Sequence, residues 1–138
     1  MGPTLISGDF ASGQVIKEAL AGVQLPLLKA HRSYVDVRDV ALAHLKAVQL
    51  PAAANKRFIL AAESHWYAGV GKILSDAYAT KGYPNIKLEG ENAGRPKYLS
   101  NAQAREVLGI EFRSAQTMLT EMVPTLVKAG IVPAPESK

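Results

Sequence analysis

The chain has 138 residues, of which 48% are hydrophobic and 20% charged, so it is long and apolar enough to fold as one domain rather than remain disordered. Its formal net charge of +4 comes from interleaved basic and acidic residues, which gives no reason to expect a nucleic-acid partner. Cysteine is absent and no apolar run approaches the roughly 20 residues that span a bilayer, so we expect a cytoplasmic protein without disulfides, thiolate metal sites or a membrane partner.

The first predicted elements are a helix and a strand, joined by an extended linker. Apolar residues recur at helical spacing behind Ser12, whose hydroxyl would cap the helix, and Gly22 would end it. Pro26 opposes a helix at the residue before it, so residues 25–28 are predicted as the linker. Residues 33–37 alternate and are rich in β-formers, which predicts a short strand.

A second helix and a buried strand follow. Asp39 is predicted as the N-cap of the helix, and Pro51 as its end. Residues 57–62 form a nearly continuous apolar run, which is typical of a parallel-sheet strand buried on both faces. The sequence offers no parallel partner strand of similar quality, so the partner would come from another chain or from polypeptide that is missing. The apolar stripe of the helix is Val40, Ala43, His44, Ala47 and Val48.

A third helix is predicted from a long apolar stripe, with Ser64 as its cap and Gly82 as its end. Residues 86–88 are predicted as a strand. Residues 91–96 are predicted as a loop because they contain Asn, Gly and Pro. The stripe of the third helix is Trp66, Val70, Ile73, Leu74, Ala77 and Tyr78.

Two helices complete the chain. Residues 100–103 resemble a capping box, and the helix that they begin would stop at Gly109. Ser114 would begin the last helix, which Pro124 should kink or split and Gly130 should end. The whole pattern predicts an α/β chain with four or five helices and two or three strands.

Motifs that carry chemistry are scarce. The three histidines have no partner at metal-ligand spacing, so no metal site is predicted, and His44 is interpreted as a core residue. Gly69 and Gly71 lie inside a helical stripe, whereas a dinucleotide fingerprint lies at a strand–helix turn. No tyrosine with a lysine four residues later is identified as a proton-transfer pair; Tyr78, with Lys81 three residues on, is interpreted as a core tyrosine. No catalytic residue is therefore predicted.

A dense charge cluster, Asp36, Arg38 and Asp39, stands between a predicted strand and a predicted helix. One interpretation is structural: Asp39 caps the helix and Arg38 pairs with a neighbouring carboxylate. The other is a polar wall beside a ligand cleft, because binding sites gather at strand ends in α/β proteins.

Several segments together resemble one family. Residues 34–44, YVDVRDVALAH, are similar to the F/Y-V-D-V-R-D-V-A-x-A-H segment of the extended short-chain dehydrogenases/reductases, in the NAD-dependent epimerase/dehydratase superfamily. The branch is that of the dihydroflavonol, cinnamoyl-CoA and aldehyde reductases. Further matches are residues 2–5 to G-P-x-L, 56–61 to x-R-F/Y-I-L-A, 100–113 to S-N-x-K-A-R-x-L-L-G-I-x-F-R, and 126–132 to the end of S-L-I-x-x-G-I-V.

The resemblance implies that residues 1–132 form the helix-rich, substrate-binding C-terminal lobe of a Rossmann-type reductase, together with the last strand of its nucleotide sheet, and that 133–138 form a disordered tail. It also implies that the Gly-rich turn and the catalytic residues belong to an N-terminal half without a counterpart in this sequence. NADP or NAD would serve the complete enzyme and would not be bound by this chain alone. Ser12 matches a position that contacts the cofactor, and Ser33 one that contacts the substrate.

Three functions are compatible with this resemblance. The first is a fragment of an NAD(P)H-dependent aldehyde or ketone reductase, which supplies the lobe for a small carbonyl substrate and is not itself catalytic. The second is a non-enzymatic interaction module derived from that lobe, which would associate with itself or with a separate N-terminal half through exposed apolar surface. The third is a truncated gene product without a function of its own.

Overall fold

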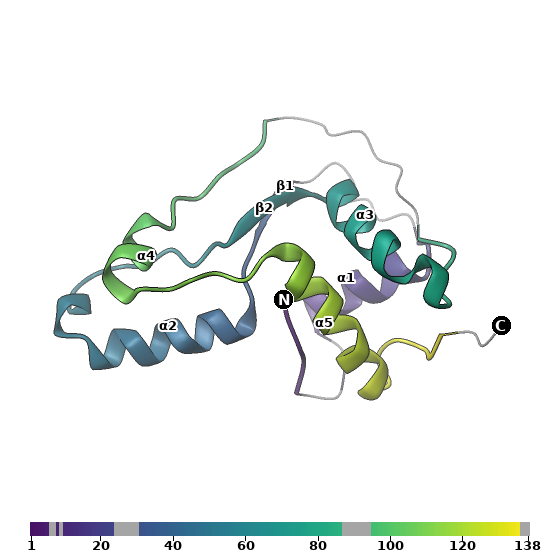
Figure 1. The fold of residues 1–138 in the computed structure, drawn as a ribbon, viewed down its shortest axis with the longest axis horizontal. Coiled ribbons are helices and arrows are strands. Elements are labelled where there is room, and N and C mark those ends of the chain that lie inside the picture. Colours follow the sequence, from purple (N-terminus) through teal and green to yellow (C-terminus); the bar gives the residue numbers. More distant parts are fainter. Residues whose placement is uncertain (6–7, 9, 24–30, 87–94, 136–138) are drawn as a thin grey trace.

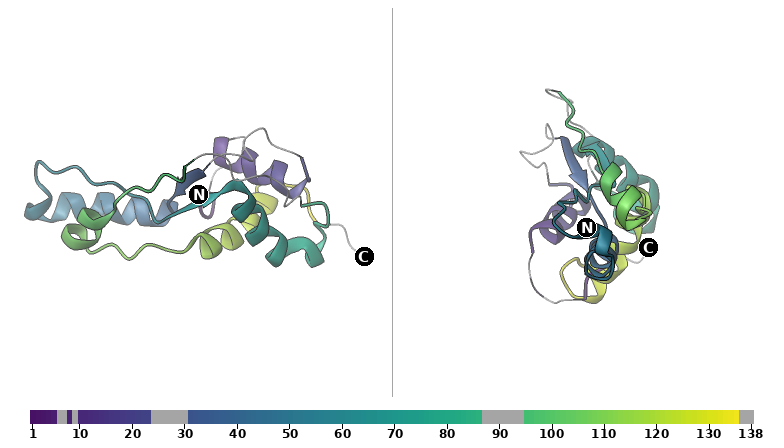
Figure 2. Two further views of the ribbon diagram at one scale, coloured as in Figure 1. Left: turned by 90° about the horizontal axis from the view of Figure 1, so that it is seen from above. Right: turned by 90° about the vertical axis from the view of Figure 1, so that its left-hand side faces the viewer.

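The computed structural model describes residues 1–5, 8, 10–23, 31–86 and 95–135, and its elements form an elongated molecule with two lobes (Figures 1 and 2). The two strands pair antiparallel, with His31 opposite Trp66 and Tyr34 opposite Glu63. The predicted helix-rich α/β class is confirmed. In chain order the elements are α1 (Ala11–Leu20), β1 (His31–Tyr34), α2 (Val37–Gln49), a 3-10 turn (Pro51–Ala53), β2 (Glu63–Trp66), α3 (Tyr67–Tyr78), a second 3-10 turn (Ala79–Lys81), α4 (Ala102–Leu108) and α5 (Ala115–Lys128).

The main lobe consists of α1, α3 and α5 with the β1–β2 ribbon (Figure 1). The apolar stripes of the three helices face one another and exclude water from a common core. Burying one such side chain contributes roughly 1.5–3 kcal/mol, so these stripes account for the stability of the lobe. The core includes Ile16, Leu20, Val70, Leu74, Met118, Leu119, Met122 and Leu126.

The distal lobe consists of α2, residues 50–62, α4 and residues 109–113, and it lies on the left of Figure 1. Within α2, which has 13 residues, Asp39 and Ala43 are the buried ones, so the helix is covered along one narrow side. The core of this lobe is correspondingly small. It contains Ala43, Ala53, Leu108 and Ile110, with Ala47, Phe58, Leu60, Val107 and Phe112 partly buried around them.

The first strand does not lie where the alternation predicted it. β1 ends at Tyr34, three residues before the predicted end at Val37, because the chain turns into α2 at Asp36. Asp36 is also the N-cap of α2, and its carboxylate accepts the Arg38 N–H at 2.8 Å. The prediction of Asp39 as the cap is wrong, since Asp39 lies in the first turn of the helix.

The predicted strand at residues 57–62 is not part of a sheet; β2 begins after it, at Glu63. The backbone of residues 57–60 makes no hydrogen bond with another described residue. At the end of the segment the Ala61 carbonyl accepts the side-chain amide of Asn101 at 2.6 Å, and the Ala62 N–H donates to the Tyr34 carbonyl at 2.7 Å. The apolar side chains at 58–60 are half-buried rather than buried on both faces.

With Asp39, four of the five predicted helix caps are wrong, and one is confirmed. Ser12 lies inside α1, Ser64 lies in β2, and the N-cap of α4 is Asn101, whose side chain makes no capping bond. Ser114 does cap α5, because its side chain accepts the Thr117 N–H at 3.1 Å. Local residue type alone therefore identified one of the five starts.

The helix ends predicted from glycine agree better with the structure. Gly82 follows α3 and its 3-10 turn with φ of 92°, and Gly109 follows α4 with φ of 59°. Both angles lie in the left-handed region that glycine adopts without a steric cost.

The prediction of His44 as a core residue is wrong. His44 is exposed, and its Nδ1 lies 2.8 Å from the carbonyl oxygen of Val40 one turn earlier. Val48, on the same predicted stripe, is 88% exposed. The apolar pattern of α2 is real, but the described part of the chain covers little of it.

Pro124 does not split the last helix, which runs without a break from Ala115 to Lys128. A proline inside a helix has no N–H, so the carbonyl four residues earlier, that of Thr120, loses its helical donor. The Tyr78 hydroxyl of α3 donates to this carbonyl at 2.5 Å. A side chain of a neighbouring helix thus satisfies the acceptor that Pro124 leaves open.

Several sequence predictions fall outside the described residues. These are the linker at 25–28, residues 87–88 of a predicted strand, residues 91–94 of a predicted loop, and the last three residues of the tail. Ile86, the described member of that strand, is buried in the main core and lies in no strand.

Candidate functional site

A cavity of about 350 Å³ opens between the N-terminal segment, α1 and α5 of the main lobe. Its volume falls within the range of small-molecule sites, which begins near 300 Å³. The cavity joins two of the segments that carry the family resemblance, residues 2–5 and the start of α2. It is lined by Met1, Gly2, Pro3, Thr4, Leu5, Phe10, Ser12, Val37 and Met122.

The N-terminal segment that forms one wall is fixed by backbone bonds. The Val37 N–H donates to the Met1 carbonyl at 2.8 Å, and the Met1 amino group donates to the carbonyl of Val35 at 3.1 Å. The Thr4 N–H donates to the side-chain oxygen of Thr125 on α5 at 2.9 Å. These bonds hold residues 1–4 between the start of α2 and the second half of α5.

Gly2 lets this segment approach the start of α2 closely. Its φ is 101°, and a Cβ atom built on it would lie 2.8 Å from Oδ1 of Asp36. A side chain at this position would be strained by its backbone angle and would also collide with the buried carboxylate. The G-P-x-L motif therefore has a steric reason for its first residue.

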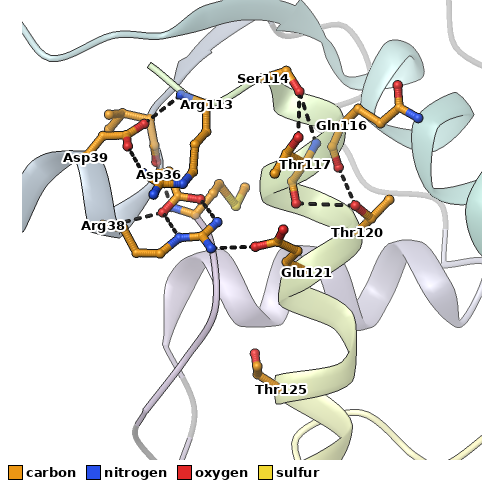
Figure 3. Close-up of polar contacts among 12 residues, drawn as sticks. Asp36, Arg38, Asp39, Arg113, Ser114, Gln116, Thr117, Thr120, Glu121 and Thr125 are labelled. Carbon is orange, nitrogen blue, oxygen red and sulfur yellow. Dashed lines mark hydrogen bonds and ion pairs between the residues drawn. The ribbon is translucent and has the colours of Figure 1, made fainter. Parts of the chain in front are cut away.

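Beside this wall, Asp36 and Arg38 form an ion pair (Figure 3). Asp36 is fully buried; its carboxylate accepts Arg38 Nη2 at 2.7 Å and Nε at 2.9 Å. Nη1 of Arg38 also donates to Glu121 of α5 at 2.5 Å. Burial alone would raise the pKa of Asp36, but the hydrogen bonds and charge of Arg38 outweigh burial and hold the pKa below its usual value.

A second ion pair ties the same end of α2 to the entry of α5 (Figure 3). Asp39 is fully buried and accepts both the backbone N–H of Arg113, at 2.8 Å, and its guanidinium group. Together with the Arg38–Glu121 pair, these two pairs form a charged joint between the lobes, made of Asp36, Arg38, Asp39, Arg113 and Glu121. The charge cluster thus connects structural elements, and Val37 within it contributes to the cavity wall.

The two predicted site residues do not lie together. Ser12 lines the cavity from the first turn of α1. Ser33 lies on β1 and is not among the cavity residues; its Oγ is 2.7 Å from the Oγ of Ser64 across the ribbon.

The cavity walls indicate which part of a dinucleotide would fit. Ser12 and Thr4 contribute hydroxyl groups, and none of the lining side chains is charged. An uncharged aromatic ring suits apolar walls with a few polar atoms, whereas the pyrophosphate of a dinucleotide is bound at a Gly-rich turn or by cationic groups. The described residues therefore fit the ring end of such a cofactor and not its phosphates.

One Tyr-x-x-x-Lys spacing does occur, at Tyr83 and Lys87, outside the predicted helices. The sequence analysis missed it. Tyr83 is buried, follows Gly82 and precedes Pro84, and its hydroxyl donates to the Pro133 carbonyl at 2.8 Å. Burial raises the pKa of Tyr83, so this hydroxyl stays protonated and engaged in the core. Lys87 lies outside the described residues.

Other residues near the site gave only weak sequence signals. Met122 is a buried apolar residue of α5, yet it also lines the cavity. Arg113 and Glu121 are 74 and 83 positions from their partners on α2, a separation that no local pattern reveals.

Few further chemical groups gather in the described part of the chain. No cluster of three or more potential metal ligands occurs there. None of the helices described has both the length and the apolar character needed to cross a bilayer. The buried Tyr34 hydroxyl has no hydrogen-bond partner among the described residues; burial raises its pKa, and it lines neither this cavity nor the smaller one in the distal lobe.

Comparison with known proteins identifies relatives along nearly the whole chain. No family model matches it. Cinnamoyl-CoA reductase 2 of Arabidopsis thaliana is 32% identical over 136 residues, which cover 99% of this chain and 41% of the relative. Cinnamoyl-CoA reductase 1 of Petunia hybrida is 33% identical over 141 residues, with 99% and 41% covered. The chain therefore spans about two fifths of the length of these relatives.

Solved structures agree on the fold. Yeast methylglyoxal/isovaleraldehyde reductase Gre2, complexed with NADPH, superposes with a TM-score of 0.75 at 21% identity, over 94% of this chain and 43% of that one. Gre2 from Candida albicans gives a TM-score of 0.74 at 22% identity, over 94% and 42%.

These matches define the class: the fold is that of the C-terminal part of Rossmann-type reductases. Within that class the relatives in sequence are the cinnamoyl-CoA reductases, and the Gre2 structures share the fold. The chain is a homologue of their C-terminal part, in the extended short-chain dehydrogenase/reductase family that its motifs predicted.

Proposed function

We propose that residues 1–132 supply the substrate-binding lobe of an NAD(P)H-dependent aldehyde or ketone reductase, in the cytoplasm, and do not themselves catalyse the reaction. The cavity between residues 1–5, α1 and α5 carries the proposal. Its apolar walls and two hydroxyl groups suit a small carbonyl compound beside the nicotinamide ring, and the relatives are reductases.

The missing catalytic group supports the non-catalytic part of this proposal. A reductase of this kind needs a proton donor at the carbonyl oxygen, and the Tyr83 hydroxyl is already bonded to Pro133 within the core. The proton donor and the phosphate-binding turn would therefore belong to a nucleotide-binding half, as would most contacts with NADP or NAD. When bound, that cofactor supplies the hydride.

Within the lobe, we assign Ser12 to the cofactor side of the cavity and Ser33 to the substrate. Ser12 lines the cavity at the start of α1, where its hydroxyl can reach an amide group on a ring. Ser33 is held by Ser64 on the ribbon, so a contact with substrate would replace that hydroxyl pair.

A fusion enzyme tests the proposal. The chain would replace the matching C-terminal part of Arabidopsis cinnamoyl-CoA reductase 2, and NADPH oxidation would be followed with isovaleraldehyde. We expect turnover by the folded fusion, none by the chain alone, and at least a tenfold loss in the fusion with Ser12→Leu, which fills the cavity. Turnover by the chain alone would contradict the non-catalytic role, and a folded but inactive fusion would contradict the reductase role.

The non-enzymatic interaction module is the second candidate, because residues 57–60 present unpaired backbone in the described structure. An interaction module would associate with a partner, but its fusion with the reductase would be inactive. The same assay therefore separates the two candidates.

A further inference from the structure

Two residues at the start of α1 are unfavourable for a helix start. The N-cap is Phe10, whose hydrocarbon side chain cannot accept a backbone N–H. Gly13 follows in the first turn, where glycine is less favourable than alanine. Residues that break a local rule in this way are expected at functional sites, where another role retains them. One role shared by Phe10 and Gly13 would explain both.

The two residues are in close contact. A Cβ atom built on Gly13 would lie 2.8 Å from Cζ and 3.0 Å from Cε1 of the Phe10 ring. Carbon atoms that are not bonded pack best at about 3.5–4.0 Å, so a side chain at residue 13 would displace the ring. Glycine is therefore the residue that lets the ring lie this close to the first turn of α1.

The same ring forms part of the cavity wall. Phe10 and Ser12 line the cavity from the start of α1, whereas Gly13 is buried and is not among the lining residues. The ring therefore lies between Gly13 and the cavity. Phe10 is also half-buried against the main core. Because close-packed neighbours hold the ring, it presents a wall of fixed position to a ligand.

The small size of the cavity makes the position of this wall important. Its volume is about 350 Å³, close to the lower end of the range for small-molecule sites. In a hydrophobic pocket of an enzyme, one methylene group changes the discrimination between substrates by roughly 10–200-fold. Removal or displacement of a whole phenyl ring should therefore change which ligands fit.

We propose that Phe10, positioned by Gly13, limits the size of the apolar group on the carbonyl compound, so that the lobe favours short or branched aliphatic aldehydes and ketones over compounds with fused aromatic rings. Phe10 contacts the substrate, and Gly13 is a positioning residue that acts through Phe10. This inference rests on the proposed function for the identity of the substrate. The size limit itself depends only on the cavity and on the ring in its wall.

Binding of two uncharged probes to the full chain tests the size limit without catalysis. Isopentanol is small and branched, and naphthylmethanol carries two fused rings. The amide signals of residues 2–5 and 11–14 in NMR titrations would report the affinity for each probe. We expect Phe10→Ala to strengthen the binding of naphthylmethanol at least tenfold relative to that of isopentanol. An unchanged ratio of affinities, or no binding of either probe, would overturn the proposal.

A more conservative variant guards against loss of the fold. Phe10→Leu keeps an apolar side chain against the main core but removes the ring. It should shift the ratio of affinities in the same direction as Phe10→Ala, by a smaller factor. A folded Phe10→Leu variant with the original ratio would also contradict the size limit.

Substitution of Gly13 tests the positioning role. Gly13→Ala should push the ring into the cavity and weaken naphthylmethanol binding relative to isopentanol, whereas in the Phe10→Ala background it should leave the ratio unaltered. Melting curves give a second readout: Gly13→Ala should raise the melting temperature more in the Phe10→Ala background, where no ring is displaced and alanine is the better helix former. Equal effects in both backgrounds would show that Gly13 does not act through Phe10.

The matched control is Gly69→Ala, the same substitution inside α3. Its Cβ atom would lie 3.7 Å from His65, an ordinary contact distance, so no side chain needs to move. The ratio of probe affinities should not change in this variant. A change as large as that in Gly13→Ala would contradict the role assigned to the ring.

The fusion with the Arabidopsis reductase extends the test to catalysis and separates this inference from the reductase function. In the fusion, Phe10→Ala should raise kcat/KM for naphthaldehyde at least tenfold relative to isovaleraldehyde. An active fusion with unchanged selectivity would contradict the size limit but not the reductase role. An inactive fusion, combined with the expected shift in probe binding to the chain, would contradict the reductase role and support the size limit.

Discussion

The bond between Tyr78 and the Thr120 carbonyl makes a quantitative prediction about Pro124. If the hydroxyl replaces the helical donor that proline lacks, Tyr78→Phe should be costly only while residue 124 is proline. Thr120 is half-buried, so leaving its carbonyl unsatisfied should cost about 1–2 kcal/mol in the free energy of unfolding.

The second background removes the need for this bond. Pro124→Ala restores an N–H that can donate to the Thr120 carbonyl, and it should stabilise the chain by about 1 kcal/mol or more, because proline is unfavourable inside a helix. In that background Tyr78→Phe should cost less than about 0.5 kcal/mol, which gives a coupling energy near 1 kcal/mol.

Urea denaturation followed by circular dichroism would measure all four proteins of this cycle. Burial raises the pKa of Tyr78, with a smaller contribution from Tyr83, so the hydroxyl remains a donor at neutral pH and the experiment needs no pH correction. If Tyr78→Phe has the same cost with proline and with alanine at position 124, the two residues are not coupled and the explanation of the unbroken helix is wrong.

Three further predictions concern the charged joint and the helix start beside it. Asp36 has a lowered pKa, so its contribution to the free energy of unfolding is complete above about pH 4 and is lost as the pH falls through the lowered value. Asp36→Asn should cost roughly 1–2 kcal/mol at pH 7, a figure that allows for the partly exposed Arg38. The same variant should flatten the acid limb of a curve of stability against pH. An unchanged acid limb would assign that limb to other carboxylates. Gly2→Ala should destabilise the chain by about 1–3 kcal/mol in thermal melts, while Pro3→Ala, the adjacent control, should have a smaller effect. Ser114→Ala should cost about 1 kcal/mol through loss of the α5 cap, and Ser114→Asp should retain most of it; equal losses in both would show that capping is not the cause.

Helix existence could be predicted from the sequence because the long helices have apolar stripes, which the main core uses in α1, α3 and α5 and which the described residues leave mostly uncovered in α2. The starts of the helices were less predictable. Ser12 and Ser64 are good capping residues, but the N-caps of α1 and α3, Phe10 and Trp66, each lie two residues away from them, where packing sets the boundary. Tertiary packing thus decided between several local candidates.

The strand at residues 57–62 illustrates a different limit. Its composition is that of a strand, yet a strand exists only when a neighbour pairs with it, and the described residues provide none. How well the charged joint could be predicted depended on separation along the sequence. Asp36 and Arg38 are near neighbours, so their pairing could be predicted. Arg113 and Glu121 are brought to α2 only by the fold.

The charged joint also determines how far the C-terminal end of α2 moves when the helix rotates. α2 has 13 residues and therefore extends about 20 Å beyond the joint at its N-terminus, so a rotation of about 10° there would displace its far end by roughly 3 Å. The ion pairs of Asp36 and Asp39 lie at the end of α2 about which it would rotate, where a small change in angle has the greatest effect on the position of the other end. Loss of one ion pair would consequently cause the largest displacement far from the altered residue, at the C-terminal end of α2.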